Sequence, residues 1–224
     1  QWRSSIDGLN FTDIAGATSE TYTSGALTQD TWFRRVVTST LTGVSCFKES
    51  NIIKVTVNNV AGGTIISDQT ICDSGDPVTF MTIVNGTGDG AVTFQWQIST
   101  DGSTFTDILG ATSPNFDAGA LTVDTWYKRI TKSLLNAVEC TKESNVVKIT
   151  INKVTGGTIA TAQTICYGST PLALTSVDDG SASGAITYQW QKSDNNVTWI
   201  NIAGATTFGY APGALLADTY YKRI

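Results

Sequence analysis

The chain has 224 residues and a net charge of −5, and only 15% of its residues are charged. An acidic balance argues against nucleic acid as a partner, because phosphates require a basic surface. The chain has no histidine, so Ser-His and Cys-His catalytic pairs are excluded within these residues. The richness in Thr, Ser and Gly fits a soluble, extracellular β protein.

Short alternating runs of apolar and polar residues, bounded by Gly, Asn, Asp and Pro, recur throughout the chain. This pattern is typical of an all-β protein. Within residues 59–152, the first predicted strand covers 62–72 and is broken near Ser67-Asp68. A turn at 73–77 precedes a second strand over 78–84, and residues 85–91 are expected to form a loop.

The next predicted strand, 92–98, places Val92, Phe94, Trp96 and Ile98 on one face, because side chains alternate with a period of two, and this puts Trp96 in the core. Asp101-Gly102 then predicts a hairpin. One or two short strands are expected within 105–121, a strong late strand within 124–133, and a closing strand over 145–152. About seven short strands with a core Trp on the third predict an immunoglobulin-like sandwich of two antiparallel sheets. A jelly roll or another sandwich with a different strand order is the alternative.

The whole pattern repeats at an interval of 94 residues. Residues 1–58 align with 95–152 without a gap, at 32 identities. A period of this length predicts tandem units that each have their own core. We expect the C-terminal part of a unit at 1–58, a complete unit at 59–152, and a unit lacking its last strand at 153–224. We interpret the sequence as a segment of a longer polypeptide. The units are expected to stand end to end, because the linkers at 58–61 and 152–155 are short and contain β-branched residues, which makes them stiff.

Several residues recur once per unit, and each has a structural and a functional interpretation. Trp2, Trp96 and Trp190 are interpreted as core residues that fill the space between sheets. Arg35, Arg129 and Arg223 are expected to form a structural ion pair rather than to clamp a ligand. Trp32 and Trp126 are the candidates for an exposed aromatic surface, since the neighbouring aromatic residue points to the opposite face.

Two acidic stretches, 72–76 and 178–184, contain enough carboxylates to raise the question of calcium. Their spacing matches no calcium-loop motif, and "CDSGD" becomes "CYGST" in the next unit. They are interpreted as solvated turns, so no cofactor and no metal is expected.

Each unit carries one cysteine after "QTI" and one before "KESN", which predicts an oxidising location and a disulfide framework. The candidates are Cys46, Cys72, Cys140 and Cys166. A bridge from Cys72 to Cys140 lets each unit fold alone and is preferred, whereas Cys46–Cys72 and Cys140–Cys166 bridges join neighbouring units. An immunoglobulin-like strand order disfavours all of these, because the first turn and the last hairpin then lie at opposite ends of a unit and bridged Cα atoms must lie within about 7 Å. Such an order brings one unit's first turn near the next unit's last hairpin instead.

The combined pattern resembles the immunoglobulin-like repeats of giant Bacteroidota surface proteins. It is carried by Gly62–Ile65, Gln69–Cys72, Pro77, Gln95–Trp96, Ser99–Gly102, Phe105–Thr112, Gly119–Thr122, Thr125–Arg129, Cys140, Ser144–Asn145 and Val147–Ile151. The resemblance implies export by the type IX secretion system and display on the cell surface or in surface filaments, and it transfers no catalytic residues. The third unit departs from the pattern at Ser193–Asn196, where the other two have a Gly-containing hairpin.

These observations favour a structural and adhesive stalk segment without enzyme activity. Its expected partners are neighbouring repeats of the same chain, further copies in a homo-oligomer or filament, and other cell surfaces or glycans. No membrane-spanning segment is expected in these residues. A glycan-binding or other ligand-binding module and an accessory repeat array of a secreted enzyme are the alternatives.

Overall fold

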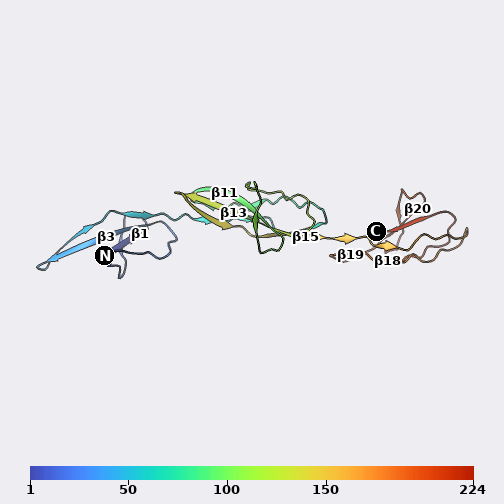
Figure 1. Ribbon diagram of the computed structural model, residues 1–224, viewed down its shortest axis with the longest axis horizontal. Helices are drawn as coiled ribbons and strands as arrows, with labels where there is room; N and C mark the ends of the chain where they lie inside the picture. The colour runs from blue at the N-terminus through green and yellow to red at the C-terminus, as the bar shows by residue number, and fades with distance from the viewer.

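The computed structural model describes all residues from 1 to 224, and the chain is all-β, with no helix of any kind. It therefore contains no helix that is long and apolar enough to cross a membrane. Figure 1 shows an elongated molecule in which the N-terminal, middle and C-terminal parts of the chain follow one another along the long axis.

The middle part of the chain holds the largest sheet. Its strands are connected in the order β12-β11-β13-β15-β8, and β14 pairs with the outer half of β13. All pairings in this sheet are antiparallel except that of β15 with β8. Two small pairs, β7 with β9 and β6 with β10, complete this part. The strands are β6 (Val60–Ala61), β7 (Thr64–Ile65), β8 (Gln69–Cys72), β9 (Thr82–Val84), β10 (Thr87–Gly88), β11 (Ala91–Ser99), β12 (Thr106–Asp107), β13 (Thr125–Leu135), β14 (Val138–Glu143) and β15 (Val147–Asn152).

The core of this part lies between the large sheet and the β7–β9 pair. Its fully or almost fully buried members are Ile65, Phe80, Trp96, Tyr127, Val147, Ile149 and Ile151. The rings of Phe80 and Tyr127 are 4.7 Å apart between centroids. On β15 the three buried residues alternate with more exposed ones, so the strand's period of two places a continuous apolar edge against the core.

Most predicted strands of the middle part are present, with three differences. The first predicted strand is divided into β7 and β8 around residues 66–68, as expected. The second is shorter than predicted, since only Thr82–Val84 is a strand. The expected loop at 85–91 contains β10, and β14 was not predicted because its alternating polar residues are exposed on both faces.

The flanking parts repeat subsets of these strands. In the first, β1 (Trp2–Ser5) lies between β2 (Thr12–Asp13) and β3 (Thr31–Leu41), and β3 also pairs with β4 (Val44–Glu49) and β5 (Ile53–Val55). In the last, β20 (Trp190–Ser193) lies between β21 (Ile200–Asn201) and β22 (Tyr220–Arg223). The pairs of β16 (Val154–Thr155) with β19 (Ser181–Ala182) and of β17 (Thr158–Ile159) with β18 (Ser176–Asp178) precede that sheet.

Candidate functional site

The recurring tryptophans are held in the same way in all three parts of the chain. The Trp96 indole Nε1 donates a hydrogen bond to the carbonyl of Ser113 (2.9 Å), and the Trp190 indole donates to the carbonyl of Thr207 (3.0 Å). Both rings are completely buried, whereas Trp2 is half-buried. A buried indole needs one acceptor, and the segment after the Gly-Ala-Thr sequence supplies it. Trp96 and Trp190 therefore act in packing and are not available to a ligand, and Trp2 donates the equivalent hydrogen bond to the carbonyl of Ser19 (3.1 Å).

The recurring arginines form no ion pair, so that prediction was wrong. Arg129 is completely buried, and its Nη1 donates to the carbonyl of Pro114 (2.7 Å) and to the hydroxyl of Thr82. Its guanidinium carbon lies 4.4 Å from the centre of the Phe94 ring. Arg35 and Arg223 likewise donate to main-chain carbonyls, of Glu20 and Phe208. Carbonyl dipoles and an aromatic face replace the carboxylate, and burial lowers the pKa of Arg129.

The acidic residue before the late strand forms the ion pair instead. Asp124 accepts a hydrogen bond from the main-chain N–H of Ile151 (2.8 Å) and lies 2.8 Å from Lys148 Nζ. These two contacts, the N–H first, lower the pKa of Asp124. Asp30 holds Val57 and Lys54 in the same manner in the first part of the chain. The closing strand is thereby fixed at the end from which the chain leaves each unit.

Each tryptophan of the candidate aromatic surface has a glycine and a lysine next to its ring. The ring of Trp126 lies close to Gly102, and Lys148 Nζ lies 5.0 Å from the ring centre. Trp32 has the same neighbours, Gly8 and Lys54. Both rings are half-buried. A sugar ring would have to displace the lysine, which favours a packing role for these tryptophans.

The hairpin next to this surface is fixed by an aspartate. The Asp101 carboxylate accepts hydrogen bonds from the main-chain N–H groups of Ser103 and Thr104, both at 2.7 Å, and from the Ser99 hydroxyl. These bonds, led by that from Thr104, hold the pKa of Asp101 far below its usual range. Asn195 makes the equivalent main-chain contacts in the last part of the chain, although the Gly is missing there.

The junction between the first and middle parts has no free residue. Val57 is bound through its N–H to Asp30. The Asn58 amide donates to the carbonyls of Ser133 (2.7 Å) and Val138 (3.1 Å), and the Ser133 hydroxyl donates back to it (2.7 Å). Asn59 then donates twice to Asp89. Consecutive residues are thus fixed to different parts of the chain, and sequence reasoning missed this, although Asn58 and Asn152 recur at the repeat interval.

The second junction has some of the same contacts. Ile151 is tied to Asp124, the Asn152 carbonyl accepts from the N–H of Asp73 (3.2 Å), and Lys153 donates to the Ser183 hydroxyl (3.2 Å).

An apolar groove of about 880 Å³ opens in the last part of the chain. Its lining includes Ile159, Leu174 and Tyr221, which stand 94 residues after Ile65, Phe80 and Tyr127. In the middle part those three residues pack against β15. The groove is therefore the place that a strand like β15 would fill.

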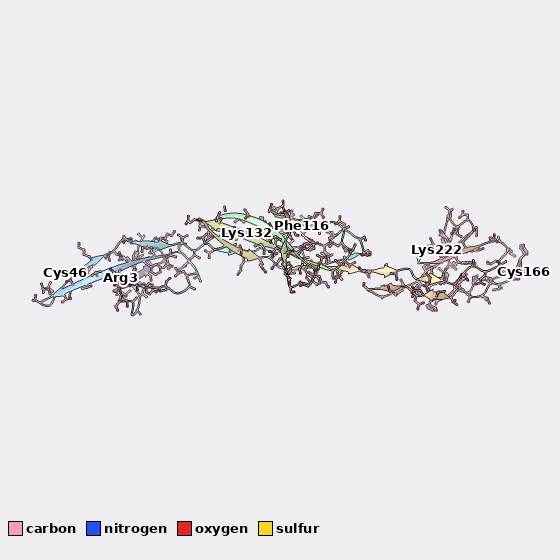
Figure 2. All side chains as sticks on the ribbon, in the orientation of Figure 1. Arg3, Cys46, Phe116, Lys132, Cys166 and Lys222 are labelled. Atoms are coloured by element: carbon pink, nitrogen blue, oxygen red, sulfur yellow. The ribbon has the colours of Figure 1, made fainter.

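All four cysteines are free thiols. Cys72 pairs with Asn152 at one end of the large sheet, whereas Cys140 pairs with Ser133 at the other. Figure 2 shows Cys46 at one tip of the molecule and Cys166 near the opposite end. This register is incompatible with the preferred Cys72–Cys140 bridge, and no disulfide joins Cys46 to Cys72 or Cys140 to Cys166 in this structure.

The acidic stretches lie on turns. Asp73 and Asp76 are exposed, and Asp178 accepts a hydrogen bond from the N–H of Gly180 at 3.0 Å. No group of three or more His, Cys, Asp or Glu side chains is placed to hold a metal ion.

A family model matches the chain three times in succession, over residues 1–59, 61–153 and 155–224. Its description is "Domain of unknown function (DUF8696)". The chain belongs to this family. The DUF8696 matches divide the chain within two residues of the expected boundaries, and both divisions fall at the junctions described above. No curated protein matches the chain.

Proposed function

We propose that this chain is a structural and adhesive stalk segment made of tandem immunoglobulin-like DUF8696 units that stand end to end on the outside of a cell. The observation that carries the proposal is the junction at 57–59, where each residue is bound to one unit or the other and none is free to act as a hinge. Junctions of this kind fix the orientation of each unit relative to the next. A stalk requires such fixed orientations, whereas an isolated binding module does not.

The unit itself supports this interpretation. The large sheet combines the order β12-β11-β13-β15-β8 with a buried tryptophan on β11, and a smaller sheet packs on the other side of the core. A central-strand tryptophan between two sheets is typical of immunoglobulin-like sandwiches. The recurring polar residues stabilise hairpins, corners and junctions. Their contacts therefore support a structural function rather than a catalytic one.

The resemblance to Bacteroidota surface repeats supplies the location. It supports a location outside the cell after type IX secretion, in an adhesin or a surface filament. Association between copies, in a homo-oligomer or a filament, belongs to the same proposal.

Immunogold labelling of intact cells with antibodies against residues 1–224 tests the proposal. We expect gold particles outside the cell envelope that are lost after brief protease treatment of whole cells, and we expect cells lacking the gene to adhere less. Labelling confined to the cell interior, or hydrolase or transferase activity abolished by one point mutation, would refute it.

A further inference from the structure

The four thiols of this chain are too far apart to pair with one another. In the middle unit, Thr125 pairs with Ile149 on β15, and Cys140 lies opposite Ser133, eight residues further along β13. Cys72 lies opposite Asn152, three residues from Ile149 in the other direction. The two cysteines are therefore separated by about 11 strand residues, or roughly 36 Å. A disulfide requires Cα atoms within about 7 Å.

Two of the cysteines, Cys72 and Cys140, nevertheless lie near a junction asparagine. Cys140 is directly opposite Ser133 on the β13–β14 hairpin, so the two side chains share one face. That face is the one that binds the preceding linker, because the Ser133 hydroxyl donates to the Asn58 side chain at 2.7 Å. Cys140 thus marks the side of a hairpin that meets the unit before it.

Cys72 lies on the other side of the equivalent junction. It pairs in register with Asn152 at the parallel edge of the sheet. Ile71 and Ile151, one residue earlier on each strand, turn toward the core, so the side chains of Cys72 and Asn152 share the opposite face. Asn152 stands 94 residues after Asn58 and is the docking point for the hairpin of a following complete unit.

We propose that the cysteine at the position of Cys72 in one unit forms a disulfide with the cysteine at the position of Cys140 in the next unit, across the junction asparagine. This chain shows one half of the pair at each junction, Cys140 at the first and Cys72 at the second. Both thiols are accessible to an oxidant, since Cys72 is exposed and Cys140 half-exposed.

The reaction is a thiol–disulfide exchange with a small disulfide such as oxidised glutathione. One Sγ–Sγ bond forms, the disulfide of the oxidant breaks, and two electrons and two protons pass to its thiols. The bridge would carry tension past the linker and fix the angle between units. Formation of this bridge in the cell rests on the proposed function, because an extracellular location supplies the oxidising conditions. Oxidation of the purified protein tests the geometry of the pair independently of that location.

The experiment extends the 224-residue chain after Ile224 with a copy of residues 131–152, which completes the last unit and adds a copy of Cys140. After incubation in a glutathione redox buffer, free thiols are alkylated and disulfide-linked peptides are mapped by mass spectrometry. We expect Cys72 to be linked to the appended cysteine, while Cys46, Cys140 and Cys166 are alkylated. The unextended chain should keep four free thiols, Cys72→Ser should abolish the bridge, and Cys166→Ser should not.

A second extended variant tests the same pair of positions at the first junction, in case the C-terminal extension does not fold. A copy of residues 59–94 placed before Gln1 completes the first unit and brings a copy of Cys72 to the first junction, where Cys140 is already in place. We expect those two cysteines to be linked. Alkylation of Cys72 in the first chain and of Cys140 in the second, or linkage of Cys72 to Cys140 in either chain, would overturn the proposal.

Discussion

A buried arginine without a carboxylate is the most unusual residue of the unit. Arg129 contributes two hydrogen bonds from one nitrogen, while its Nε and Nη2 have no partner. A cation without a counter-ion is costly to bury, so the carbonyl of Pro114, the Thr82 hydroxyl and the Phe94 ring must together offset its desolvation. The planar guanidinium reaches all three at once, which an ammonium does not.

Arg129→Lys should therefore destabilise the middle unit by about 1–3 kcal/mol, because the buried charge remains while its planar contacts are lost. Hydrogen exchange of β13 and β15 amides measures this within the middle unit. Lys142→Met, on the exposed strand β14, is the matched control and should change stability by less than about 0.5 kcal/mol. Equal protection in the two variants would contradict the role given to Arg129.

Asp101 provides a pH test with an internal control. Its pKa is depressed in the folded hairpin, so the stability that it contributes is present above the ordinary aspartate value of about 3.9 and is lost as the pH falls below it. In an NMR titration from pH 5 downward, we expect the amides of Ser103 and Thr104 to shift only well below pH 3.9. The amides of Val197 and Thr198 should not follow, because Asn195 holds them and does not titrate. A midpoint near 3.9 at Asp101 would show that these hydrogen bonds do not form in solution.

At the scale of elements, the closing strand decides whether a unit is complete. Its three inward residues, Val147, Ile149 and Ile151, are at most 4% exposed. In the last unit the same place is an open groove beside Gln163–Cys166, the counterpart of β8. Because β8 pairs in parallel with β15, the edge of the groove offers main-chain groups to an incoming strand.

A synthetic peptide copying residues 144–153 should therefore bind the 224-residue chain at one site. We expect amides of residues 163–166 to become protected from hydrogen exchange, because the peptide supplies both a parallel ladder and three apolar side chains. A peptide with serine in place of Val147, Ile149 and Ile151 is the control and should give no protection. Equal protection by both peptides would mean that the groove does not recognise the closing strand.

The sequence was informative where a local pattern decides the structure. The period of two on β11 predicted the inward position of Trp96, and the Ser67-Asp68 interruption predicted the division between β7 and β8. It was uninformative where the partner is remote. The hydroxyl of Thr82 reaches Arg129 from β9 and the carbonyl of Pro114 reaches it from a loop, and Asn58 meets Ser133 across 75 residues. Such contacts depend on how segments that are far apart in the sequence come together in the fold. The spacing of residues within one segment does not predict them.

At the scale of the whole molecule, the hydrogen bonds made by the linker residues determine how stiff the junction between two units is. A linker behaves as a flexible coil when several of its residues are free to rotate. At 57–59 each residue is hydrogen-bonded to one of the two units. Figure 1 shows that the tip of β13 reaches back beside the first junction.

Small-angle scattering on three complete units should therefore report a rod. Three complete units, with strands of about 25–30 Å and loops that bring each repeat to about 35–45 Å, should have a maximum dimension near 110–130 Å. Asn58→Ala removes the bonds to Ser133 and Val138 and should broaden the distance distribution between spin labels placed on the first and middle units. Asn10→Ala, in an exposed hairpin of the first unit, is the control and should leave that distribution unchanged. A compact particle of about half the expected length would mean that the units pack side by side, and a stalk could not be built from them.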